Sequence, residues 1–294
     1  MEIFQIPQLR QPIMIVAFSG WSDAGEAATG ALTHLMENLS HGSLSSEAVL
    51  VAEYEPEDFY DFQVNRPMIS VDDSLVRSVN WPSTQIYGLS TPEFENDFVL
   101  VLGVEPSMKW KTFTTLLLDL ADDLEVELVV TLGAMLADAP HTRPISITIT
   151  SQNEIARSAL NIERSHYEGP VGIMSVLGME FEKAGIPTIA VWASVPHYVQ
   201  NAPSPKATLS MLIEIERLLK VEFEHGSLAD EAFTWERSID ELAEGDEDMA
   251  GYIEQLESTR DALDSEAAQG EALAQEFERF LKLEDDAKPE TDDQ

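Results

Sequence analysis

Between residues 13 and 219, short apolar runs alternate with segments whose apolar residues recur every three or four positions. The runs are five to eight residues long and rich in β-branched side chains, as is typical of buried strands. The other segments have the periodicity of amphipathic helices. Because strands that alternate with helices form layered sheets, we expect an α/β fold with helices on both faces of the sheet.

The apolar runs predict strands at residues 13–18, 48–52, 85–89, 98–104, 128–132, 145–149 and 186–193. The periodic segments predict helices at residues 24–39, 110–124, 152–160, 172–184 and from Pro205 onward, where Ser204 has the position of a capping residue. Residues 54–90 break this rhythm with aromatic and turn residues. We therefore expect antiparallel strands or an excursion there, and a mixed sheet.

Acidic residues are concentrated toward the end of the chain. The 294 residues include 54 Asp and Glu against 17 Lys and Arg, which gives a formal net charge of -37, and residues 221–294 alone contain 25 acidic and 5 basic side chains. The change in charge places a domain boundary near residue 225. We therefore expect an α/β core domain at 1–225, an acidic helical region at 226–283 and a disordered tail at 284–294. Narrow apolar stripes in that region predict two or three helices, with Ala232, Trp235, Ile239, Leu242; Met249, Ile253, Leu256, Leu263; and Leu273, Phe277, Phe280, Leu281.

The amino-acid composition also excludes several classes of function. A polyanion repels nucleic acid and anionic membranes, so neither is an expected partner. The absence of cysteine excludes disulfides, thiol catalysis and cysteine-based metal centres. The first residues have no signal-peptide pattern, and the apolar runs are too short to span a bilayer, so we expect a cytoplasmic protein.

Common catalytic and cofactor motifs are absent from the sequence. It contains no glycine-rich dinucleotide or P-loop fingerprint, no nucleophile elbow and no zinc-protease motif. We expect no cofactor. Ser19, Ser22 and Ser194 remain unranked nucleophile candidates, because spacing alone cannot reveal a Ser-His-Asp relationship.

The first informative motif joins the first predicted strand to the first predicted helix. Asp23 and Glu26 have the spacing of a capping box, in which side chains bind the free N–H groups at a helix start. A glycine-bearing turn such as the one at Gly20 also binds anions on these groups. We favour the structural role, since Asp23 already occupies the cap, and retain Gly20 and Asp23 as candidate ligand-binding residues.

Two Pro-His pairs follow predicted strands. His141 and Arg143 lie after strand 128–132, at the edge where open α/β sheets bind ligands, and His197 lies after strand 186–193. His141 is a candidate base or anion ligand, and Arg143 a candidate anion clamp. The alternatives are that Arg143 pairs with Asp138 to brace its loop and that His197 is a hydrogen-bonded core or interface residue. No Asp or Glu lies near either histidine at the spacing that is typical of metal ligands, so we expect no metal site.

Lys109 and Lys111 lie in the first turn of the helix predicted at 110–124, where positive charge opposes the helix dipole. They form a candidate contact for an acidic partner. The alternative, which we favour, is that they pair with Glu105 and nearby carboxylates.

Several motifs in order resemble the proteasome assembly chaperone two family, most of all its actinobacterial branch. The resemblance covers roughly residues 1–225 and rests on Phe18–Gly25, Asn65–Pro67, Leu102–Pro106, Pro140–Pro144, Tyr167–Ile173, Val195–Tyr198 and Pro203–Thr208. It implies a three-layer α/β/α fold with a mixed sheet, similar to phosphorylase/hydrolase-like proteins. Eukaryotic and archaeal relatives bind proteasome α subunits or form homo-oligomers, and the family supplies no catalytic residues.

The leading hypothesis is therefore a non-enzymatic, protein-binding homo-oligomer that acts like an assembly chaperone, with itself and proteasome α subunits as partners. The alternative is an enzyme or small-ligand binder. Its crevice for a nucleoside, phosphate or carboxylate would be lined by His141, Arg143, His197 and the turn from Gly20 to Asp23. A third hypothesis is a structural oligomer whose charge serves solubility.

Overall fold

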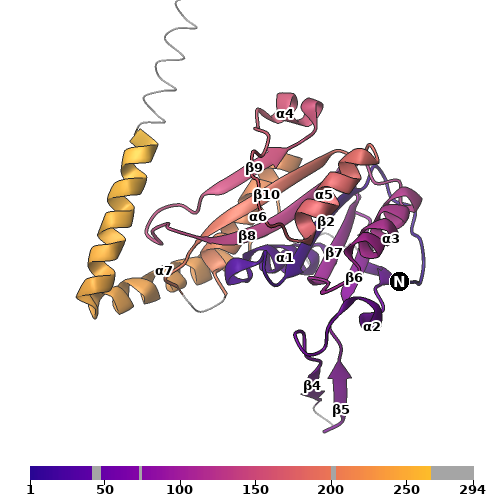
Figure 1. Cartoon of the computed structure of the whole chain (residues 1–294), viewed down its shortest axis with the longest axis horizontal. Coiled ribbons are helices and arrows are strands. Elements are labelled where there is room, and N and C mark those ends of the chain that lie inside the picture. Colours follow the sequence, from indigo (N-terminus) through magenta and orange to yellow (C-terminus); the bar gives the residue numbers. More distant parts are fainter. Residues whose placement is uncertain (42–47, 73–74, 200–202, 266–294) are drawn as a thin grey trace, which may run out of the picture.

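The computed structural model describes residues 1–41, 48–72, 75–199 and 203–265. Among these residues, eight strands form one mixed sheet in the order β1-β3-β6-β7-β2-β8-β10-β9 (Figure 1). The strands are β1 (Glu2–Ile3), β2 (Ile13–Ser19), β3 (Ala48–Glu53), β6 (Thr84–Leu89), β7 (Phe98–Val104), β8 (Leu128–Ala137), β9 (Ile147–Ser151) and β10 (Thr188–Pro196). Strands β7, β2, β8 and β10 are parallel, and the strands outside them pair antiparallel with their neighbours. The predicted mixed sheet is confirmed.

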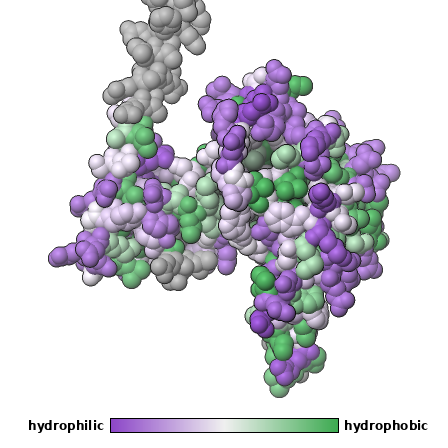
Figure 2. All heavy atoms as spheres, in the orientation of Figure 1, coloured by the Kyte–Doolittle hydropathy of each residue, from purple (hydrophilic) through white to green (hydrophobic). Residues whose placement is uncertain are grey.

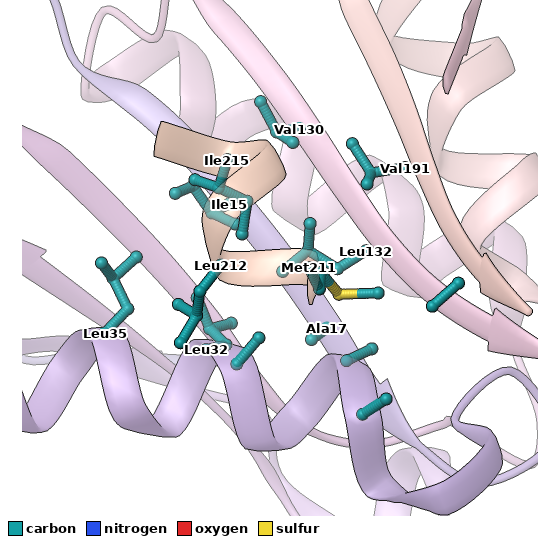
Figure 3. Packing of buried hydrophobic residues seen from close by; sticks show 14 of the residues in the cluster. Ile15, Ala17, Leu32, Leu35, Val130, Leu132, Val191, Met211, Leu212 and Ile215 are labelled. Atoms are coloured by element: carbon teal, nitrogen blue, oxygen red, sulfur yellow. The ribbon is translucent and has the colours of Figure 1, made fainter. Parts of the chain in front are cut away.

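Helices cover both faces of this sheet. On one face, α1 (Ala27–His41) and α6 (Pro205–Leu219) share a core with Ile15 and Ala17 of β2, as Figure 3 shows. On the other face, α3 (Trp110–Asp123) and α5 (Ile173–Lys183) share a core with Val16 and Phe18. Because β2 is buried on both faces, its sequence is a continuous apolar run rather than an alternating one. The predicted three-layer α/β/α fold is confirmed.

Some predicted element ends are wrong. Strand β8 continues five residues beyond the predicted end at 132, because its pairing with β10 runs on to Ala137 opposite Pro196. Strand β9 begins at Ile147 rather than at 145 and is followed by α4 (Glu154–Leu160). The hydroxyl of Ser204 does not cap α6: it is buried and has no hydrogen-bond partner within the described part of the chain.

The predicted excursion at 54–90 is also confirmed. After α2 (Pro56–Phe59), strands β4 (Met68–Val71) and β5 (Arg77–Asn80) form an antiparallel hairpin that projects from the body (Figure 1). We call residues 64–81 the arm. Figure 2 shows that hydrophobic residues gather on this projection.

The chain continues after α6 into α7 (Leu228–Glu244), which packs on α6, and into a helical stretch at 247–265. Ile239 and Ala243 of α7, and Ile253 and Leu256 of the next stretch, are buried, as the first two stripes partly predict. Leu242 and Leu263 are exposed, so those two positions were predicted wrongly; the buried face of α7 includes Ala243 rather than Leu242. The third stripe and the tail lie outside the described residues. No helix in the described ranges is long and apolar enough to cross a membrane.

Candidate functional site

The carboxyl ends of the parallel strands β2, β7, β8 and β10 meet at one edge of the sheet, which we call the carboxyl edge. The loop after β2 contains Gly20 and Asp23, the loop after β8 contains His141 and Arg143, and the loop after β10 contains His197. The N-termini of α1 and α5 lie at the same edge. This is the edge at which open α/β sheets bind ligands.

Asp23 occupies the N-terminus of α1. Its Oδ1 accepts hydrogen bonds from the backbone N–H groups of Ala28 and Thr29 at 2.8 and 3.2 Å, and its Oδ2 accepts one from the Thr29 hydroxyl at 2.5 Å. Burial raises the pKa of the Asp23 carboxyl above its ordinary value, although these hydrogen bonds oppose the shift. Glu26 does not complete the predicted capping box, because its φ of 51° lies in the left-handed region, outside the helix.

Glu105 occupies the N-terminus of α5 in the same way. Its Oε1 accepts a hydrogen bond from the backbone N–H of Ile173 at 3.0 Å. Gly172 leaves room for this carboxylate, because a Cβ there would lie only 3.0 Å from Oε1. Gly20 has a similar role: with φ of 130° it lets the turn pass Glu105, whose Cβ would lie 3.4 Å from a side chain at Gly20. The places where a ligand anion would bind these helix ends therefore hold carboxylates of the same chain.

His141 is fully buried and is held between two other elements. Its backbone N–H donates to the Tyr198 hydroxyl at 2.7 Å, and its Nδ1 lies 2.8 Å from the same hydroxyl. In the neutral imidazole, the hydroxyl proton is then directed to Nδ1, which leaves Nε2–H to donate to Oδ1 of Asp240 in α7 at 3.0 Å. Burial raises the pKa of Tyr198 to about 12, so the hydroxyl keeps its proton at neutral pH. His141 thus connects the loop after β8 to α7.

Arg143 connects the same loop to the helical stretch at 247–265. Its Nε and Nη2 donate to the two carboxylate oxygens of Asp261 at 2.8 and 2.9 Å, and its Nη1 donates to Glu257 at 3.2 Å. The hydrogen bonds with Asp261 raise the pKa of Arg143 and lower that of Asp261. The predicted pairing of Arg143 with Asp138 is wrong, because Asp138 lies instead beside His197 and Tyr252.

The two Pro-His loops do meet in space. Tyr198 makes edge contacts with the rings of both His141 and His197, and the His197 Nδ1 lies 3.2 Å from Oδ1 of Asp138. Tyr252 of the helical stretch packs on His197 and Tyr198. Residues that the sequence analysis did not single out supply most of these contacts. We call the whole set the clasp: His141, Thr142, Arg143, His197, Tyr198 and Lys206 on the core, against Glu236, Asp240, Tyr252, Glu257 and Asp261 on the C-terminal helices.

Lys206 adds a further connection across the clasp. Its Nζ donates to the backbone carbonyl of His141 at 2.5 Å and forms an ion pair with Glu236 of α7. The scarce basic residues of the core thus meet the acidic residues of the C-terminal helices. That charge imbalance between the two parts of the sequence was the one signal that could have predicted this pairing.

Lys109 and Lys111 lie away from the clasp. Lys109 precedes α3 in the left-handed conformation and forms an ion pair with Asp58 at 2.7 Å. Its partner is therefore a nearby carboxylate, but not Glu105, which caps α5. Lys111 is exposed in the first turn of α3.

Few of the charged and nucleophilic side chains at the carboxyl edge are free to bind a ligand or to react. In the described residues, Arg143 and Lys206 are paired with carboxylates, and the buried Ser22 hydroxyl has no hydrogen-bond partner that would activate it. Three hollows of about 750, 560 and 210 Å³ lie in the described part of the chain, and the five candidate ligand-binding residues line none of them. Across the described ranges, no group of three or more His, Asp or Glu side chains could hold a metal ion.

Comparisons with known proteins agree with the fold. A PAC2 family protein from Streptomyces avermitilis is 40% identical, with a TM-score of 0.73, and the match covers 82% of this chain and 99% of that one. A proteasome-assembly chaperone homologue from Mycobacterium tuberculosis is also 40% identical, with a TM-score of 0.72 and the same coverage. A second Mycobacterium tuberculosis protein, of unknown function, is 27% identical, with a TM-score of 0.79 and 92% of each chain covered.

A search of the curated proteins finds no match. Residues 17–243 match the sequence profile of the PAC2 family, and this range includes the end of β2, the parallel strands β7, β8 and β10, the loops of the carboxyl edge and nearly all of α7. The three-layer fold, the motif order and the profile agree, and the chain belongs to the PAC2 family.

Proposed function

We propose that this protein is a non-enzymatic, protein-binding homo-oligomer that acts like an assembly chaperone for proteasome α subunits. The family membership and the 40% identity to a proteasome-assembly chaperone homologue support this role. The structural observation that carries the proposal is the occupied carboxyl edge. Carboxylates of the chain itself hold the helix N-termini and the cations that a small anionic ligand would use.

A small-ligand site at His141, Arg143 and His197 would need a large rearrangement. A phosphate or carboxylate would have to displace Asp261 and Glu257 from Arg143, and His141 has no exposed surface. The two parallel hydrogen bonds of a bidentate Arg–carboxylate pair are already well aligned. A ligand anion that replaced Asp261 would form the same hydrogen bonds and gain no better ones. The clasp therefore favours a role in which this edge positions the C-terminal helices rather than a substrate.

The acidic helices then form part of the surface that partners meet. The clasp uses the core cations to hold α7 and the stretch at 247–265, whose remaining acidic side chains face solvent. Lys109 and Lys111 stay a predicted contact for an acidic partner; both are exposed, and Lys109 already forms an ion pair with Asp58.

Affinity capture of the full-length protein from its own cells tests the proposal. The co-purifying proteins are quantified against the captured chain by mass spectrometry. We expect near-stoichiometric proteasome α subunits, in a form that lacks mature core particles. If a small-molecule-processing enzyme complex or no other protein is recovered, the assembly-chaperone role is wrong.

A further inference from the structure

The strands β8, β10 and β9 at one edge of the sheet have two chemically different faces (Figure 1). The face toward α1 and α6 carries apolar side chains that join the core there, among them Val130, Leu132 and Val191. Because side chains alternate along a strand, the intervening residues lie on the face of α5, and two of them are Thr131 and Trp192. This second face is therefore polar and aromatic where a buried sheet face is normally aliphatic.

A hollow of about 210 Å³ lies on this second face, between the strands, α5 and residues 165–171. With a water molecule taking ~30 Å³, the hollow has room for about seven waters or for an organic molecule of similar size. None of the clasp residues lines it. The hollow is therefore a different place from the candidate crevice at the carboxyl edge.

Thr131 directs an unpartnered hydroxyl into this hollow. The residue lies in the middle of β8, is only 3% exposed and lines the hollow. Its hydroxyl forms no hydrogen bond with any residue that the structure describes. Because a buried polar group without a partner destabilises the fold, such a group in a hollow indicates a polar occupant.

Glu182 adds a carboxylate to the same hollow. Its Oε1 accepts a hydrogen bond from the backbone N–H of Thr188 at 2.7 Å, and it forms no ion pair within the described part of the chain. Glu182 lies in the last turn of α5, where the helix dipole is negative and a carboxylate is unfavourable. Glu180 in the same helix is instead paired with Lys183 at 2.6 Å. The negative charge of Glu182 thus lacks a cation beside it.

Trp192 forms part of the floor of the hollow. A Cβ at Gly133 would lie 2.8, 2.8 and 2.9 Å from three atoms of the six-membered ring of Trp192. Such equal distances place one face of the ring over Gly133, so the indole lies flat against β8 and its other face is directed away from the sheet. Aromatic faces attract cations.

Positive charge is missing from the lining of the hollow. No Lys or Arg is among the described residues that line it. Arg157 donates to the backbone carbonyls of Ser151 and Gln152 but does not itself line the hollow. Val171 and Met174 add apolar surface. The lining thus suits a cation with a short apolar body and offers an anion no positive partner.

We propose that this hollow binds a small organic cation, a primary ammonium group on a short alkyl or hydroxyalkyl chain. The ammonium group has three N–H donors, which suit the Glu182 carboxylate and the Thr131 hydroxyl, and the Trp192 ring attracts its charge. Val171 and Met174 contact the alkyl chain. The net charge of -37 raises the concentration of such cations near the protein.

The probe for the first test is 5-amino-1-pentanol, and its neutral counterpart is 1,5-pentanediol. Each is titrated into isotope-labelled full-length protein, in buffer with enough salt to screen the net charge. The signal is the indole N–H resonance of Trp192, assigned by its absence from the spectrum of Trp192→Phe. We expect a saturable shift with the amino alcohol and none with the diol. Equal shifts with both compounds, or no saturable shift with the amino alcohol, would overturn the cation site.

Glu182→Gln tests the charge, because the amide still accepts the Thr188 N–H. The matched control is Glu180→Gln, which changes the net charge of the same helix equally but lies outside the hollow. We expect at least tenfold weaker binding of 5-amino-1-pentanol by Glu182→Gln and an unchanged dissociation constant for Glu180→Gln. Equal weakening in the two variants would show only attraction to an acidic surface and would refute the site.

Thr131→Val separates ligand binding from a structural role. Valine keeps the shape of threonine and removes a hydroxyl that has no partner in the described structure, so the thermal unfolding midpoint of the free protein should stay the same or rise. Binding of 5-amino-1-pentanol should weaken at least fivefold. A lower unfolding midpoint with an unchanged dissociation constant would make Thr131 structural and refute its place in the site. These results do not depend on capture of α subunits, so failure of either proposal leaves the other in place.

Discussion

Replacing Tyr198 by Phe removes one oxygen atom from the centre of the clasp. That hydroxyl accepts the backbone N–H of His141 and reaches its Nδ1, while the His141 side chain is completely buried. The change therefore leaves a donor and an acceptor without their partner. A buried polar group that loses its partner costs about 1–3 kcal/mol, and because Tyr198 is only half-buried, water can partly replace the hydroxyl. We expect a loss of about 2 kcal/mol in the free energy of unfolding.

Urea unfolding followed by fluorescence measures this loss. With a slope of about 3 kcal/mol per molar urea, the midpoint falls by about 0.7 M. The matched control is Tyr167→Phe, because the exposed Tyr167 hydroxyl donates to a nearby carbonyl, that of Pro170, at 2.9 Å. Its loss should stay within about 0.5 kcal/mol. If the two variants are equally stable, the clasp does not hold His141 in the way described.

Three further predictions concern the carboxyl edge and the sheet. Because burial raises the pKa of the Asp23 carboxyl above its ordinary value of 3.8, ionisation of this group destabilises the folded state. The free energy of unfolding of the wild type, measured relative to that of Asp23→Asn, should therefore fall as the pH rises from about 4 toward neutrality. An increase over this pH range would contradict the prediction. Gly103→Ala should destabilise by about 3 kcal/mol or more, since a Cβ would lie 2.3 Å from the Ser83 carbonyl, whereas Gly251→Ala, with nothing within 4 Å, should be neutral or slightly stabilising in the same unfolding assay. Phosphate, acetate or nucleosides should leave the thermal unfolding midpoint unchanged, and a shift that Arg143→Ala abolishes would restore the small-ligand site.

The sequence predicts the layers of the fold well, because a strand buried on both faces appears as a continuous apolar run and a helix packed on the sheet as an apolar stripe. The apolar runs at β2 and β7 and the helical stripes of α1 and α3 follow from which residues leave water. The ends of strands and helices are harder to predict from the sequence. The last part of β8, from Gly133 to Ala137, is apolar but contains no β-branched or aromatic residue, so its sequence is not typical of a strand. Pairing with β10 holds it in the sheet, where Gly133 lies under Trp192.

The carboxyl edge shows what sequence patterns leave out. Positions of His141, Arg143 and His197 at strand ends were predicted from the strands that precede them, and the structure places all three in one region. Their partners were not predicted, because Asp240, Glu257 and Asp261 lie about a hundred residues later in a region with many equivalent carboxylates. Only the three-dimensional packing of α7 and the stretch at 247–265 selects these three.

In the proposed function, this PAC2 family protein binds proteasome α subunits rather than a small molecule at its carboxyl edge. The most direct measurement is the equilibrium binding of the purified full-length chain to purified α subunits from the same organism, with mature core particles as the comparison. We expect saturable binding to free α subunits, clearly tighter than to mature particles. Absence of binding to α subunits at concentrations where the chain is itself oligomeric would contradict it.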